Sequence, residues 1–106
     1  MNDGVQPILK ELRRRLETLC GPRLVKIILY GSQARGDAEP GSDVDVLVVL
    51  QGLVQPGEEI QRTGATVAEL SLRFDEVINC VFVDERRFVN RNGPFLRNVR
   101  REGITV

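Results

Sequence analysis

The chain has 106 residues, which fits a single domain over 1–106 and is too short for a second hydrophobic core. It is 42% hydrophobic and 28% charged, and its 15 basic and 15 acidic residues leave no basic excess of the kind that marks direct nucleic-acid binding. It contains no histidine, so His-based catalytic triads and His-ligated zinc sites are excluded.

Membrane and redox signals are weak. No apolar run approaches the ~20 residues that span a bilayer, and the first residues form no apolar signal region. Cys20 and Cys80 lack the spacing of a metal site, and we expect buried free thiols rather than a disulfide. These observations predict a cytoplasmic protein with no membrane association.

Helical and strand patterns alternate along the chain. We expect a first helix with an apolar stripe from Ile8 to Leu19, strands over Lys26–Tyr30 and Val44–Leu50, a helix over Glu58–Phe74, a strand over Glu76–Val83, and short helices over Asp84–Val89 and Phe95–Arg101. In the helix over 58–74 the residues expected to face inward are Ile60, Val67, Leu70 and Phe74. The order predicts an α/β domain of the α+β kind, with a small mixed β-sheet and helices packed mainly on one face.

A glycine-serine turn follows the first strand. Gly31 can adopt backbone angles closed to other residues and lets a phosphate approach the main chain. Ser32 offers a hydroxyl and opens a short helix whose free N–H groups suit an anion. Arg35 adds a guanidinium suited to phosphate oxygens.

An acidic pair begins the second strand. Side chains alternate across a strand, so Asp43 and Asp45 project from the same face. Two carboxylates held so near each other repel one another unless a proton or cation lies between them. A hard divalent ion, usually Mg²⁺, is the natural occupant, and it normally brings substrate phosphates as further ligands.

The segment GSQARGDAEPGSDVDVLVVL, residues 31–50, resembles the GSxARGxxxxxSDxDxxV pattern of the minimal nucleotidyltransferases, small relatives of the polymerase-beta superfamily. The resemblance implies a polymerase-beta-like fold and transfer of a nucleoside monophosphate, AMP from ATP, with one or two Mg²⁺ ions. It implies that Asp43 and Asp45 are the catalytic metal ligands. It assigns the nucleotide to Gly31, Ser32, Arg35 and Ser42, with Ser42 orienting the metal-bound groups.

The chain departs from the family in one place. Members usually carry a third acidic residue within the next core strand, and the middle of Glu76–Val83 instead reads Ile78-Asn79-Cys80-Val81. Asp75 and Glu76 stand at its start, and Glu76 is the candidate for the third catalytic carboxylate. Asn79 offers a neutral oxygen but cannot act as a base.

The resemblance extends to the antitoxins of two-component systems whose toxin is a HEPN-domain ribonuclease. It implies a protein adenylyltransferase that attaches AMP to a tyrosine of such a partner. Two alternatives stay open: a catalytically weak module that neutralises its partner by binding, and an enzyme with a small-molecule acceptor. A homodimer through a strand edge or the first helix also stays open. The arginine-rich C-terminal quarter is either a partner face or ordinary surface charge, and Arg13–Arg15 are expected on a solvated helix face.

Overall fold

The computed structural model describes residues 3–106 and contains one four-stranded mixed sheet. Its strands are β1 (Leu24–Tyr30), β2 (Val44–Leu50), β3 (Ile78–Asp84) and β4 (Ile104–Thr105), in the order β3-β2-β1-β4. β2 is antiparallel to β1 and parallel to β3, and β4 is antiparallel to β1. The mixed sheet expected from the sequence is confirmed.

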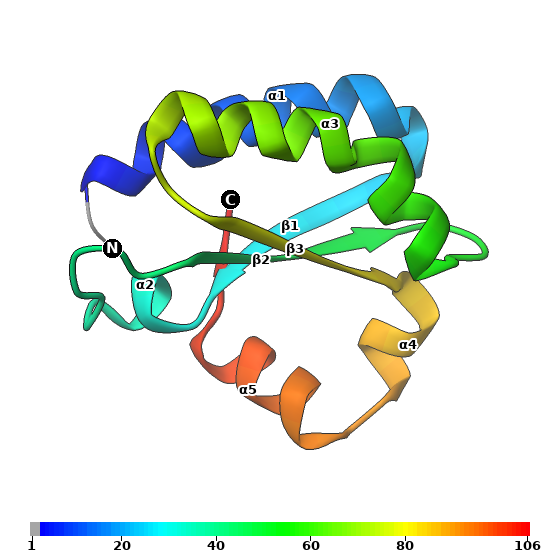
Figure 1. Ribbon diagram of the computed structural model, residues 1–106. Helices are drawn as coiled ribbons and strands as arrows, with labels where there is room; N and C mark the ends of the chain where they lie inside the picture. The colour runs from blue at the N-terminus through cyan, green and yellow to red at the C-terminus, as the bar shows by residue number, and fades with distance from the viewer. Residues whose placement is uncertain (1–2) are drawn as a thin grey trace.

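Helices cover both faces of this sheet (Figure 1). The long helices α1 (Gln6–Cys20) and α3 (Pro56–Phe74) lie on one face, and the short α4 (Glu85–Asn90) and α5 (Pro94–Glu102) lie on the other. A four-residue helix, α2 (Ser32–Arg35), follows β1, and 3-10 turns over Asp3–Val5 and Gly21–Arg23 flank α1. No helix in residues 3–106 has the length and apolarity to cross a membrane.

The central strand β2 is buried on both sides. Val46 and Val48 join the core beneath α1 and α3, whereas Leu47 and Val49 join the smaller core beneath α4 and α5. A strand covered on both faces needs a continuous apolar run, which explains the sequence VDVLVVL. The only polar side chain of β2 is Asp45, near its start.

The buried side of α3 differs from the expected one. Ile60 is 54% exposed, and the first turns of the helix instead bury Glu59 and Thr63. Glu59 is neutralised by Arg23 at 2.8 Å and Arg62 at 3.1 Å. The expectation for Ile60 is therefore wrong, because a twice-paired carboxylate occupies the inward position that an apolar residue was expected to fill. Leu70 is buried as expected, and Val67 and Phe74 are partly buried against the same core.

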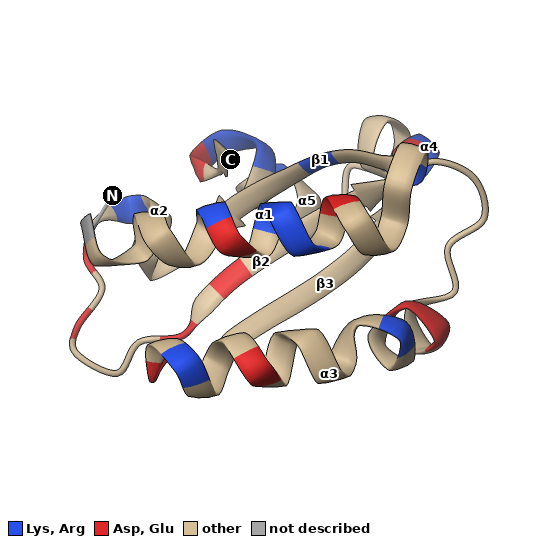
Figure 2. Ribbon diagram, turned by 90° about the horizontal axis from the view of Figure 1, so that it is seen from above, with Lys and Arg blue, Asp and Glu red and all other residues tan. Residues whose placement is uncertain are grey.

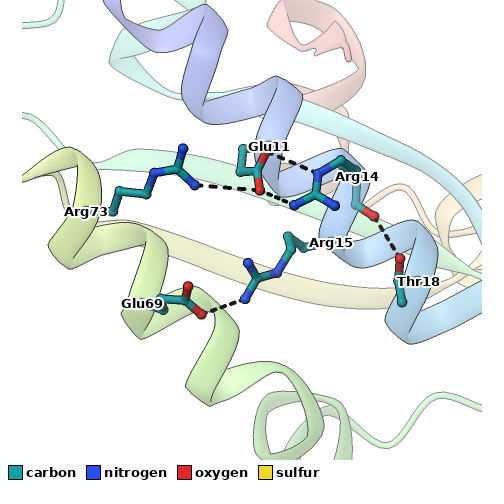
Figure 3. Close-up of polar contacts among 6 residues, drawn as sticks. All are labelled: Glu11, Arg14, Arg15, Thr18, Glu69 and Arg73. Atoms are coloured by element: carbon teal, nitrogen blue, oxygen red, sulfur yellow. Dashed lines mark hydrogen bonds and ion pairs between the residues drawn. The ribbon is translucent and has the colours of Figure 1, made fainter.

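Ion pairs connect α1 and α3 on their solvent side (Figure 3). Arg15 lies 2.6 Å from Glu69, and Arg73 lies 3.7 Å from Glu11, which also pairs with Arg14. Pairs as exposed as these contribute little free energy each. The arginine run on α1 is thus a solvated face that also contacts the neighbouring helix.

The strand β4 was not expected from the sequence. It has two residues, too few to show any pattern, and pairs with Ile28 and Leu29 of β1. Gly103 makes this possible, because a Cβ there would collide with the carbonyl oxygen of Val99 and with the side chain of Ile28.

Both cysteines are free thiols, as expected, with Cys20 buried and Cys80 half-buried. Burial raises the pKa of Cys80 to about 12 and also raises the pKa of Cys20. A raised pKa keeps the thiolate scarce at pH 8, so we expect both thiols to react slowly with a disulfide reagent in the folded protein. The same reagent in denaturant is the reference; equal rates in the two conditions would contradict the expectation.

Candidate functional site

The candidate site lies where β1 ends and β2 begins, at the strand start that is coloured as acidic in Figure 2. Asp45 stands in the sheet between Tyr30 on β1 and Asn79 on β3. Asp43 precedes β2 by one residue, with the same alternation as Asp45. Both carboxylates therefore belong to the face of the sheet that α4 and α5 cover, as the alternation predicted.

Asn79 holds the two carboxylates together. Its side-chain nitrogen donates hydrogen bonds to Asp43 Oδ2 at 2.7 Å and to Asp45 Oδ1 at 3.2 Å. This nitrogen marks a point within ligand reach of two carboxylates, and rotating the amide would present its oxygen there instead. Three oxygen ligands are a donor set that suits Mg²⁺. Within residues 3–106 no group of three acidic, histidine or cysteine side chains that could hold a metal is assembled.

Gly31 is in direct contact with Asp45. Its φ of +77° lies in the region that favours glycine, and a Cβ at this position would stand 2.7 Å from Asp45 Oδ2. The turn and the acidic strand are thus fitted against each other. The sequence predicted that Gly31 lets a phosphate approach the main chain. The structure shows that the carboxylate of Asp45 also lies close to this glycine.

We expect Gly31→Ala to disturb the site more than backbone strain alone can explain. The left-handed backbone costs about 1–3 kcal/mol for a residue with a side chain, and the added methyl displaces Asp45 as well. Gly36→Ala is the matched control, because Gly36 has φ +83° and no atom within 4 Å of its would-be Cβ. Both variants should melt at lower temperature, and only Gly31→Ala should weaken divalent-metal binding measured by calorimetry. Equal metal affinity in the two variants would refute the contact argument.

α2 presents the start of a helix beside the acidic pair. The carbonyl of Gly31 accepts from the N–H groups of Ala34 and Arg35, so the N–H groups of Ser32 and Gln33 precede the first helical turn. The hydroxyl of Ser32 makes no hydrogen bond to another described residue. The short helix expected after the turn is present, and the binding of an anion to these groups stays a prediction.

The loop between α2 and β2 is held from inside. Ser42 Oγ accepts from the N–H of Glu39 at 2.9 Å, and Gln33 donates to the carbonyl of Ser42 at 3.4 Å. Gln33 is buried, and its Oε1 has no hydrogen-bond partner among the described residues. The hydroxyl of Ser42 therefore shapes the loop, a role that the sequence did not indicate, and no sequence signal marked Gln33.

Arg35 is engaged away from the carboxylate pair. Its guanidinium lies 3.2 Å from Asp37 in the loop and 3.3 Å from Glu102 at the end of α5. The hydrogen bond that Arg35 donates to Asp37, with a smaller effect from Glu102, raises the pKa of Arg35. A phosphate that binds Arg35 has to compete with these two carboxylates. The link to Glu102 joins the turn to an element 67 residues away, which the sequence could not reveal.

Tyr30 and Phe95 border the site on the side of α5. Their rings meet edge to face with centroids 5.3 Å apart. Burial, followed by the charge of Asp45, raises the pKa of Tyr30, so its hydroxyl stays protonated at neutral pH. Tyr30 was read from the sequence only as the last residue of a strand.

Glu76 lies apart from this cluster. It precedes β3, its N–H donates to the carbonyl of Ser71, and by alternation it shares the side of Ile78 rather than that of Asn79. Within the described residues no hydrogen bond or ion pair joins it to the acidic pair. The structure brings together Gly31, Ser32, Asp43, Asp45 and Asn79, and it leaves Glu76 outside.

Comparison with known proteins shows which family the chain resembles in sequence. Residues 8–92 match the family model described as "Nucleotidyltransferase domain". Two proteins of Methanocaldococcus jannaschii, both named "Putative protein adenylyltransferase", are similar to this chain. One is 38% identical over 90% of this chain and 90% of its own length. The other is 35% identical over 68% of this chain and 72% of its own length.

Solved structures agree in fold. A crystal structure of "a putative nucleotidyltransferase from Sulfolobus solfataricus" gives a TM-score of 0.65 at 20% identity, covering 93% of this chain and 76% of that one. A toxin-antitoxin crystal structure with AMP-PNP gives a TM-score of 0.63 at 18% identity, and the match covers 91% of this chain and 70% of that one. The structure of a tri-AMPylated Shewanella oneidensis HEPN toxin in complex with MNT antitoxin gives a TM-score of 0.59 at 19% identity. This match covers 94% of this chain and 69% of that one. The family model spans most of the chain and the fold agrees, so this protein belongs to the nucleotidyltransferase domain family.

Proposed function

We propose that this protein is a Mg²⁺-dependent nucleotidyltransferase that transfers AMP from ATP to a side-chain hydroxyl of another protein. The new bond joins the hydroxyl oxygen to the alpha-phosphorus, the hydroxyl loses its proton, and pyrophosphate leaves. The observation that carries the proposal is the pair Asp43 and Asp45, held side by side by Asn79 against the Gly31 turn. The names of the M. jannaschii relatives support a protein acceptor, and the AMP-PNP of one structural neighbour supports ATP as the donor.

The residues divide the work by chemistry. Asp43 and Asp45 would hold the Mg²⁺, with the oxygen of Asn79 as a third ligand. The ion supplies charge neutralisation of the triphosphate when bound. Gly31 and Ser32 bind the outer phosphates through main-chain N–H groups and a hydroxyl, Arg35 binds the polyphosphate, and Ser42 keeps the loop in place. Such contacts act by positioning and electrostatics, which dominate phosphoryl transfer.

The proposed acceptor is a HEPN-domain toxin that the protein neutralises by adenylylation of a tyrosine. The structural neighbour in which a tri-AMPylated HEPN toxin is in complex with MNT antitoxin supports this choice. The supply of ATP places the proposed reaction in the cytoplasm. A third acidic group is not part of the assembled cluster; loss of AMP transfer in Glu76→Gln would show that Glu76 serves as one.

The experiment is a label transfer. Protein purified with its native partner is incubated with Mg²⁺ and ATP labelled in the alpha-phosphate, with gamma-labelled ATP as the control for phosphorylation. Label on the partner from the alpha-phosphate alone, absent with Asp43→Asn, is the expected result. Label in a small molecule, with the purified protein alone, would instead indicate a small-molecule acceptor.

A second candidate is a module that neutralises its partner by binding, without catalysis. The observation in its favour is Asn79 itself, an amide at the centre of the acidic pair where the family usually has a further carboxylate. This reading expects stable partner binding, no label transfer, and full neutralisation by Asp43→Asn.

A further inference from the structure

The outer edge of β3 has no strand beside it. β3 is the last strand of the sheet, and its partner on the other side is β2. The carbonyl of Val77 accepts from Val44 while the N–H of Ile78 points the other way, to Ser71. By alternation the main-chain groups of Cys80 and Phe82 face outward. Free edges are normally protected by lysine, proline or a bulge, and residues 78–83 carry no charge, no proline and no bulge in their pairing with β2.

A groove of about 500 Å³ runs beside this edge, between β3 and α3. Figure 2 shows α3 along one margin of the molecule, with β3 nearest to it at the start of the strand. The α3 side of the groove is an uncharged stripe at helical spacing: Ile60, Thr63, Gly64, Val67, Ala68 and Ser71. Ile60 is 54% exposed on the α3 side of the edge, and Val81, whose partner Leu47 belongs to the face beneath α4 and α5, is 39% exposed on the other side. Gly64 and Ala68 lie mid-stripe, where small residues let a second helix approach closely.

Opposite charges lie at the two ends of this edge. Asp43, Asp45, Asp75 and Glu76 lie at or near the start of β3, and within residues 3–106 none of them forms an ion pair. Past its end, Arg86, Arg91 and the acidic Glu85 are likewise without an ion pair to a described residue, while Arg87 is held by Asp84, so two unpaired arginines outnumber one unpaired carboxylate there. An antiparallel copy of the same edge would place each acidic end beside the other copy's arginines.

We propose that a second copy of this chain docks on the β3 edge and the α3 stripe, and that the protein is a homodimer with one continuous sheet. A two-fold axis requires each edge to run antiparallel to its copy, which is the arrangement that pairs the unpaired charges. In such a dimer the β3 edge, the α3 stripe and the charged ends of each copy all lie in the interface.

The dimer completes the surroundings of the acidic site. Directly opposed residues of antiparallel strands share a face, so α4 of the second copy lies on the face that carries Asp43 and Asp45. Its arginines add positive charge beside a site built for a polyanion. This goes beyond the proposed transfer reaction and does not depend on it.

The first test measures mass in solution without nucleotide. Light scattering across a range of protein concentrations should give twice the 11.9 kDa of the chain. Val81→Lys places a charge on the edge strand of each copy and should raise the dissociation constant of the dimer at least ~100-fold. Leu72→Lys is the matched control, since Leu72 is 84% exposed on α3 and outside the groove, and it should remain a dimer. Thermal melts establish that both variants fold.

The second test addresses the charges. Arg86→Glu should weaken the dimer about tenfold or more, and Arg97→Glu, the same change on α5, should not. Added salt should weaken the wild-type dimer and have less effect on Arg86→Glu. A wild-type monomer at every concentration, or a dimer indifferent to Val81→Lys, overturns the proposal. A monomer whose capture of the acceptor protein is lost in Val81→Lys overturns it too, and assigns the groove to the acceptor.

Discussion

Asp43→Asn and Asp45→Asn are each expected to reduce AMP transfer at least ~100-fold. A change in the surroundings of a metal ligand already costs about 10- to 100-fold in affinity or activity, and these changes remove a charged ligand itself. The shape of the side chain is retained, so the effect isolates the charge. The measurement is the initial rate of label transfer over a range of Mg²⁺ concentrations.

Two features separate this result from misfolding. Removing one of two adjacent like charges relieves repulsion, so both variants should melt no lower than the wild type. Glu58→Gln makes the same change of charge on an exposed turn of α3 and should transfer AMP normally. Full activity in either aspartate variant would end the metal assignment.

Asn79→Asp is expected to make the stability of the protein depend on divalent metal. The substitution replaces two donated hydrogen bonds, at 2.7 and 3.2 Å, with a third negative charge at the same point. Each lost bond to a carboxylate is worth roughly 1.5–3 kcal/mol before the repulsion is added. The melting temperature should fall by about 5 °C or more in chelator and recover with Mg²⁺, which three carboxylates bind more tightly than two.

The comparison variant is Asn90→Asp, the same substitution at an exposed position at the end of α4. It should show no difference between chelator and Mg²⁺. If Asn79→Asp behaves like Asn90→Asp, the point between the carboxylates is not a cation site. If it also raises AMP transfer, the amide limits catalysis in the natural sequence.

The sequence predicted the parts of the site that lie close along the chain. Gly31, Ser32, Asp43 and Asp45 are separated by one turn and one loop, and the alternation of β2 alone puts both aspartates on one face. Strands β1 to β3 were also predicted within two residues at each end, because each is a clear apolar run.

What the sequence missed depends on contacts between distant segments. The pairing of Asn79 with Asp45 follows from the register of two parallel strands, which no local pattern specifies. The ion pair of Arg35 with Glu102 depends on the path of α5, and the exposure of Ile60 follows from the burial of Glu59 between two arginines. In each case tertiary contacts decided what propensity left open.

The burial of β2 has a consequence for how the site works. Its residues from Val46 to Leu50 are completely buried, so the strand whose start carries Asp45, with Asp43 just before it, is held in place by close packing. The packing therefore keeps the carboxylates of Asp43 and Asp45 close together despite their repulsion, which creates a preorganised negative electrostatic field. The amide of Asn79, which can rotate about its side-chain bonds, offsets this repulsion. If a cation binds here as proposed, the two carboxylates are already side by side, and the amide is the group that has to rotate.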